Sequence, residues 1–112
     1  MIVAHSERGE LERCLGSIRD QAGMPVQVVL IDNASTDDTV PWARKNQPEV
    51  AIIELDENFG VAARQYGLER ARAPLTMFLD SDAALTAGAL PAMVAALDQH
   101  PDWGLIGPRL VG

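Results

Sequence analysis

The chain has 112 residues, of which 47% are hydrophobic, and it carries a formal net charge of −7. This length and composition predict a single globular domain over residues 1–112 and argue against disorder. The acidic balance argues against nucleic acid as a partner, because no basic stripe could neutralise phosphates, and the single cysteine excludes an internal disulfide. No apolar segment approaches the ~20 residues of a membrane span, so we expect a cytoplasmic protein with no membrane segment.

Apolar runs alternate with amphipathic segments along the chain. Runs rich in aliphatic residues predict strands at residues 1–4, 26–31, 50–55 and 75–79, with a possible fifth at 103–107. Apolar side chains at helical spacing predict helices at residues 10–21, 61–72 and 87–99, and another that ends near residue 46. This alternation predicts an α/β fold, a three-layer sandwich in which right-handed crossovers place successive helices on the two faces of a mostly parallel sheet.

The apolar run at residues 75–79 ends in two carboxylates separated by one residue, Asp80-Ser81-Asp82. In open α/β sheets, ligands bind outside the carboxyl ends of the strands. Two hard oxygen donors at such a place suit Mg²⁺ or Mn²⁺, which is commonly held together with substrate phosphates. Taken alone, however, the tripeptide is more often a turn in which Asp and Ser bond their own backbone.

A second strand, at residues 26–31, also ends in a carboxylate, that of Asp32. An acid at this place can hydrogen-bond a nucleotide, or it can form an Asx turn, and the residues alone leave both possibilities open. Ser35 and Asp38 have the spacing of a capping box for the next helix. Arg64 lies in the first turn of the predicted helix at residues 61–72, where a cation opposes the helix dipole, so it indicates either an anionic ligand or a solvated arginine.

Four short stretches follow one another along the chain: LERCLGSI at residues 11–18, VLIDNASTDDT at 29–39, NFGVAAR at 58–64 and FLDSDA at 78–83. Together they resemble the amino-terminal half of family 2 glycosyltransferases, the inverting enzymes with the GT-A nucleotide-sugar-binding fold. The resemblance covers nearly the whole chain. It implies a Rossmann-like sheet that binds a nucleotide-diphosphate sugar, most commonly a UDP-sugar, for transfer to an acceptor hydroxyl.

The resemblance also implies roles for individual residues. Asp32 corresponds to the acid that contacts the base, and Ala4 and His5 to the wall of the same pocket, although the family usually has Thr or Pro, then Tyr, at these two positions. Arg64 corresponds to a position close to the nucleotide. The Asp80-Ser81-Asp82 segment corresponds to the family's Asp-x-Asp motif, with Asp82 the direct ligand of Mn²⁺ or Mg²⁺ and Asp80 nearer the ribose or the metal-bound waters.

The resemblance places the general base, which deprotonates the acceptor, in a carboxyl-terminal half beyond these residues. We therefore expect a full-length enzyme to transfer sugar and the isolated chain to be inactive. A haloacid-dehalogenase-type phosphatase is an alternative, but it needs a lysine after its Asp-x-Asp, and none follows Asp82. A second alternative is a truncated, non-catalytic module that forms a homo-oligomer through an uncovered sheet edge.

Overall fold

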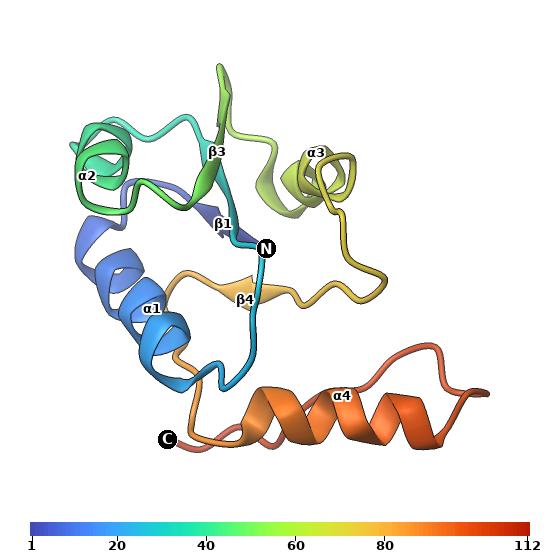
Figure 1. Cartoon of the computed structure of the whole chain (residues 1–112). Coiled ribbons are helices and arrows are strands. Elements are labelled where there is room, and N and C mark those ends of the chain that lie inside the picture. Colours follow the sequence, from blue (N-terminus) through green and yellow to red (C-terminus); the bar gives the residue numbers. More distant parts are fainter.

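The computed structural model describes residues 1–112 and contains a four-stranded sheet in which every strand pair is parallel. The strands lie in the order β3-β2-β1-β4 (Figure 1). Their bounds are Ile2–Ala4 (β1), Val29–Asn33 (β2), Ala51–Leu55 (β3) and Leu79–Asp80 (β4). The predicted α/β fold with a parallel sheet is therefore confirmed.

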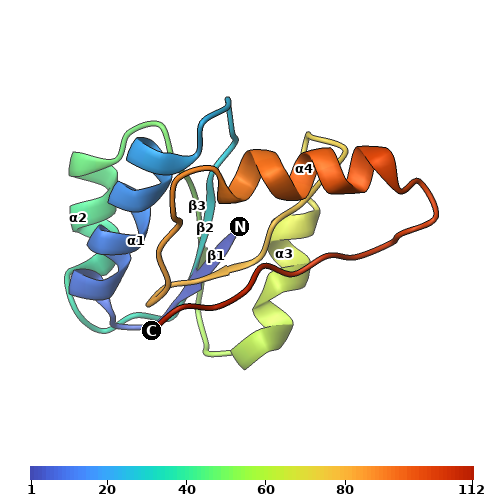
Figure 2. The ribbon, with the colours of Figure 1, turned by 90° about the horizontal axis from the view of Figure 1, so that it is seen from below.

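Helices cover both faces of the sheet, but successive helices do not simply alternate. Figure 2 shows α1 and α2 on one side of the strands and α3 on the other. The path from β1 through β2 to β3 runs in one direction, so right-handed crossovers put both connecting helices on the same face. The connection from β3 to β4 runs back past β1, which puts its helix on the opposite face. The helices are α1 (Arg8–Gln21), α2 (Thr39–Asn46), the 3₁₀ turn η1 (Gly60–Ala63), α3 (Arg64–Leu68) and α4 (Ala89–Gln99).

The core follows this layering. The larger apolar cluster joins the sheet to α1 and α2, with Leu11, Cys14 and Leu30 fully buried, while a smaller cluster on the other face includes Ile31 and Ala63. The strand order changes direction between the neighbouring strands β1 and β4, because the chain leaves β1 toward β2 on one side and enters β4 on the other. In open α/β sheets such a switch point is where ligands bind.

Two strand predictions are wrong in extent and one is wrong altogether. The strand expected at residues 26–31 begins at Val29 and continues through the polar Asp32 and Asn33. The run at 75–79 contributes only Leu79 to a strand, and Leu75 and Phe78 remain exposed. Residues 103–107 form no strand. A strand needs a neighbour that supplies hydrogen bonds, and the only neighbour of β4, the three-residue β1, offers little ladder to extend.

Helix starts also differ from the predictions. The segment expected to start a helix at residue 61 is a 3₁₀ turn that leads into the short α3, and α4 starts at Ala89 rather than 87, after Gly88 with φ of 78°. The predicted capping box is wrong, because α2 begins at Thr39 and Asp37 accepts the Thr39 N–H at 3.0 Å. No helix is long and apolar enough to cross a membrane.

Candidate functional site

The carboxyl ends of three strands bring most of the predicted site residues to one edge of the sheet. Ala4 pairs with Asp32 across β1 and β2, and Val3 pairs with Asp80 across β1 and β4. Ala4 is buried and His5, the next residue, is exposed. The polar ends of β2 and β4 therefore flank the end of β1, at the switch point of the sheet.

Hydrogen bonds join the loop after β1 to the loop after β2. His5 Nδ1 lies 2.7 Å from the Asn33 carbonyl oxygen, so this nitrogen carries the proton and donates. The Ser6 N–H donates to Ser35 Oγ at 2.8 Å, and the Thr36 N–H donates to Ser6 Oγ at 2.9 Å. Ser6 has a φ of 51°, a left-handed conformation that is uncommon for a residue other than glycine and is often found at functional sites.

Asp32 forms a turn and also keeps a free acceptor. Its Oδ2 accepts the Ser35 N–H at 3.1 Å, whereas its Oδ1 is buried and has no hydrogen-bond partner. The residue is 4% exposed. Buried polar atoms are nearly always paired, and an unpaired one costs about 1–3 kcal/mol, so Oδ1 is an acceptor that lacks a donor in this chain. The Asx-type turn that the sequence allowed is therefore present, and the second carboxylate oxygen remains unpaired.

Asn33 is a buried residue of the site region that the sequence analysis did not single out. Its Oδ1 accepts the Phe59 N–H at 2.8 Å and its Nδ2 donates to the Gly60 carbonyl at 3.1 Å. Its backbone carbonyl accepts the bond from His5. Asn33 therefore connects the end of β2 both to the loop after β1 and to the segment that carries Arg64. The only sequence signal was an amide directly after the acid at a strand end.

Arg64 and Asp80 form an ion pair. The Arg64 guanidinium lies 3.2 Å from Asp80 Oδ1, and its Cζ lies 5.2 Å from the centre of the Phe78 ring. The side chain of Arg64 is 39% exposed and that of Asp80 is 73% exposed, so the pair contributes little to stability. It brings a cation to the β4 end of the site, in a protein whose overall charge is negative.

The Asp80-Ser81-Asp82 segment turns away from the sheet immediately after β4. Ser81 is buried and its hydroxyl donates to the Glu7 carboxylate. The Asp82 carboxylate is exposed and has no hydrogen-bond or ion-pair partner, while the Asp82 carbonyl oxygen accepts a bond from Arg13 at 2.9 Å. No three His, Cys, Asp or Glu side chains gather into a closed metal site. Mg²⁺ and Mn²⁺ are commonly held by one or two carboxylates together with substrate phosphates, and Asp80 and Asp82 fit that donor set.

Cys14 lies under this segment and is fully buried. Its Sγ donates a weak hydrogen bond to the Asp80 carbonyl at 3.6 Å. Burial raises the pKa of the Cys14 thiol to about 11, which keeps the group protonated at neutral pH. Cys14 is therefore a small buried hydrophobe rather than a nucleophile.

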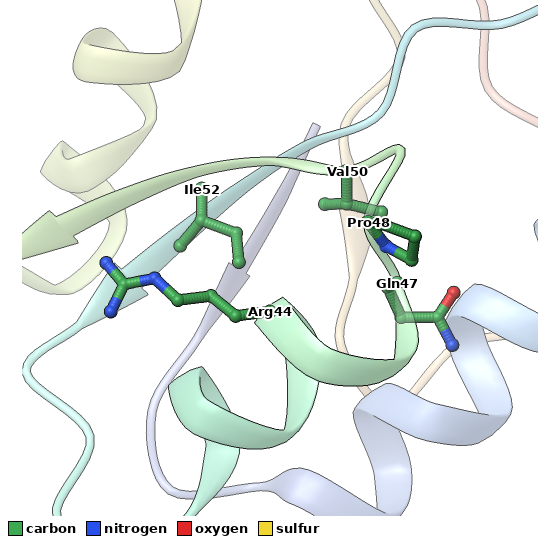
Figure 3. A pocket seen from close by; sticks show the side chains of 5 residues that line it. All are labelled: Arg44, Gln47, Pro48, Val50 and Ile52. Carbon is green, nitrogen blue, oxygen red and sulfur yellow. The ribbon is translucent and has the colours of Figure 1, made fainter.

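Two pockets of the chain lie away from these residues. One pocket, with a volume of about 250 Å³, lies at the amino-terminal end of β3, where Gln47 and Pro48 precede the strand. Figure 3 shows the side chains that line it. A second pocket, of about 300 Å³, lies between α1 and the segment before β2. Both are at the opposite ends of the strands from Asp32 and Asp80. The candidate site, at the carboxyl ends of the strands, is therefore separate from these two pockets.

Comparisons with known proteins agree on one family. Among curated proteins, the chain is 34% identical over 76 residues to an uncharacterized glycosyltransferase of Mycobacterium tuberculosis, covering 68% of this chain and 34% of that protein. It is 35% identical over 88 residues to the dodecaprenyl-phosphate galacturonate synthase of Rhizobium johnstonii, covering 74% of this chain and 26% of that protein. The chain therefore spans about a third or less of these relatives.

Solved structures show the same fold. S. aureus TarS, in complex with UDP, matches with a TM-score of 0.79 at 24% identity, over 90% of this chain and 32% of that one. The mannosyltransferase PcManGT from Pyrobaculum calidifontis, in complex with GDP-Man and Mn²⁺, matches with a TM-score of 0.69 at 26% identity, over 86% of this chain and 30% of that one. These neighbours have the GT-A fold, as the sequence predicted. The family model named Glycosyl transferase family 2 matches residues 1–112, and the chain therefore belongs to that family.

Proposed function

We propose that these residues form the donor site of an inverting glycosyltransferase and bind a nucleotide-diphosphate sugar, a UDP-sugar above all, together with Mn²⁺ or Mg²⁺. The observation that carries the proposal is the buried Asp32 Oδ1 without a partner, at the carboxyl end of β2 and beside β1, one of the two strands of the switch point. Such an atom binds a ligand that brings its own N–H donor, and the uracil ring has one. The UDP bound to TarS and the GDP-Man and Mn²⁺ bound to PcManGT, both structural neighbours, support this class of ligand.

Each residue of the edge then has a role in holding the donor. Asp32 accepts from the base, and His5, held by its bond to Asn33, lines the same side with the backbone of Ala4. Arg64 supplies positive charge for the diphosphate. The buried Ser81 lies between the two aspartates, in the segment that would face the donor. Asp80 and Asp82 provide the carboxylates for the cation, which when bound acts as a Lewis acid on the diphosphate leaving group. We assign no residue of this chain as the base, so we propose that these residues bind the donor and do not transfer sugar by themselves.

Isothermal titration with UDP tests the proposal. We expect the parent chain to bind UDP in the presence of Mn²⁺ and to lose most of that affinity in EDTA. Asp82→Ala should remove the effect of Mn²⁺, while Asp102→Ala, which removes an exposed carboxylate remote in sequence from the site, should behave like the parent. Absence of binding by the parent, or equal binding by Asp82→Ala, would contradict the proposal. Titration with GDP in parallel shows whether the site prefers uracil or guanine.

A non-catalytic, self-associating module is the second candidate. The observation in its favour is that β3 has a neighbour on one side only, so its other edge could pair with a second copy. Light scattering that finds a dimer, combined with no rise in melting temperature on addition of UDP and Mn²⁺, would support this alternative over the donor site.

A further inference from the structure

The sheet does little to hold the Asp80-Ser81-Asp82 segment. β4 pairs with β1 at two positions only, Ile2 with Leu79 and Val3 with Asp80. Ser81 and Asp82 lie beyond the end of this ladder. A segment with so few backbone bonds needs other contacts if its carboxylates are to keep one geometry.

Helix α1 supplies these contacts from residues at helical spacing. Cys14 Sγ donates to the Asp80 carbonyl at 3.6 Å, Arg13 Nη2 donates to the Asp82 carbonyl at 2.9 Å, and Ser17 Oγ accepts the Leu85 N–H at 2.9 Å. Side chains three and four apart share one face of a helix, so these contacts come from one stripe of α1. The residue just before the helix, Glu7, accepts the bond from the Ser81 hydroxyl.

Arg13 is the cationic member of this set, and a second contact orients its side chain. The same Nη2 nitrogen that donates to the Asp82 carbonyl also donates to Glu10 Oε2 at 2.8 Å, which uses both of its hydrogens. The Arg13 side chain is 64% exposed, so its ion pair adds little to the stability of the fold. Its specific effect is to fix the backbone of the residue whose carboxylate is exposed and unpartnered.

We propose that Arg13 is a positioning residue, which orients Asp82 for the divalent cation through the Asp82 carbonyl and is itself oriented by Glu10. This inference rests on the proposed donor site. It predicts that Arg13 controls the coupling between the cation and the nucleotide, which is the gain in nucleotide affinity when the cation is present. The affinity for the nucleotide alone should not depend on Arg13.

The test measures the dissociation constant of UDP by titration calorimetry with Mn²⁺ and again with EDTA. The constant in EDTA divided by the constant with Mn²⁺ gives the effect of the metal. For Arg13→Met we expect this ratio to fall about threefold to tenfold, the range for losing one partly exposed charge-assisted hydrogen bond, with affinity in EDTA unchanged. Arg13→Lys should recover part of the ratio, because an ammonium can still donate to the carbonyl.

Arg19→Met is the matched control. Arg19 lies on the same helix, its side chain is also 64% exposed, and it pairs only with the adjacent Asp20, so the ratio should stay at the parent value. If Arg13→Met does not fold, Glu10→Gln keeps the guanidinium while weakening its anchor, and it should lower the ratio by a smaller factor.

The outcomes separate the two ideas. A parent chain that shows no Mn²⁺-dependent binding of UDP overturns the proposed donor site and this inference with it. If the parent chain does show Mn²⁺-dependent binding, but Arg13→Met and Glu10→Gln keep the parent ratio, only the role of Arg13 is overturned. Equal loss of affinity with Mn²⁺ and in EDTA also overturns that role, because Arg13 would then act on the nucleotide or on the fold as a whole.

Discussion

Asn33 connects three parts of the site, through its side-chain amide and its backbone carbonyl. One buried side chain accepts from the Phe59 N–H and donates to the Gly60 carbonyl, a pairing that needs an acceptor and a donor at once. A carboxylate of the same shape can only accept. The identity of this residue therefore decides whether the loop before α3 is held against the end of β2.

We expect Asn33→Asp to lower the free energy of unfolding by about 2 kcal/mol, because it leaves the Gly60 carbonyl without its donor and buries a charge. Urea denaturation followed by circular dichroism measures the change. Asn58→Asp is the control, since exposed Asn58 only accepts a bond, from the Gly60 N–H at 2.8 Å, and a carboxylate can do the same. Equal stability of Asn33→Asp and Asn58→Asp would contradict the assigned role of the Asn33 amide.

Asp32 carries the second prediction at this scale. In Asp32→Asn, the amide oxygen can still accept the Ser35 N–H, but an NH₂ group takes the place of the unpartnered Oδ1. We expect UDP to bind about tenfold more weakly, because two donors would then face each other, with little loss of stability. Calorimetry and thermal unfolding measure the two effects. Unchanged UDP affinity in a folded variant would remove Asp32 from the proposed site.

At the scale of single elements, two helical glycines differ in how closely they are packed. Gly67 of α3 lies against the sheet, and a Cβ built there would lie 2.7 Å from Ile31 Cδ1 and from Met1 Sδ. Gly16 of α1 has only the Arg19 guanidinium near its Cβ position, at 3.7 Å. The close contact between α3 and the sheet therefore depends on the absence of a side chain at Gly67.

These environments give opposite expectations for the same change. In Gly67→Ala the added Cβ must displace the ends of the Ile31 and Met1 side chains, so overpacking should outweigh the better helix propensity of alanine and destabilise the protein by about 1 kcal/mol. Gly16→Ala should stabilise it by about 0.5–1 kcal/mol, because only the propensity changes. Chemical denaturation of both variants measures the difference. A stabilised Gly67→Ala variant would mean that α3 can move away from the sheet at no cost.

The start of α2 adds a pH dependence. The side-chain and backbone hydrogen bonds from Thr39 hold the pKa of the Asp37 carboxyl below its ordinary value of 3.8. A carboxyl whose pKa is lower in the folded state contributes stability above that ordinary value and loses it as the pH falls through the folded-state pKa. Asp37→Ala should thus be less stable than the parent at pH 7, and the difference should shrink below pH 4. Thermal unfolding at pH 7 and at pH 3 checks this, and a difference that persists at low pH would contradict it.

At the scale of the whole molecule, the charge decides how a donor can bind. A protein with a net charge of −7 repels a nucleoside diphosphate, and Arg64, the cation at the β4 end of the site, is already shared with Asp80. A divalent cation offsets this repulsion. We therefore expect UDP with Mn²⁺ at 100 times its dissociation constant to stabilise the fold by about 2.7 kcal/mol, and UDP in EDTA to have little effect. Melting curves measure both, and an equal rise in EDTA would argue against a metal-assisted site.

Local patterns in the sequence were sufficient for the family, the parallel α/β fold, the four main strands and the acids at the ends of β2 and β4. The family comes from the resemblance of four short stretches to known members, and the other features depend on neighbouring residues, through apolar runs, helical spacing and turn residues. The same patterns overestimated the strand at residues 75–79, because apolar composition does not reveal whether a neighbouring strand is long enough to pair.

Only the tertiary structure decided which residues support these acids. Arg13 meets Asp82 across 69 positions of sequence, and Asn33 meets Gly60 across 27. No local spacing encodes such contacts, since they arise from the direction in which each crossover turns and from how closely each helix packs on the sheet. The sequence by itself thus determined which chemical groups stand at the strand ends, while the packing of α1 and of the loop before α3 determined how those groups are held.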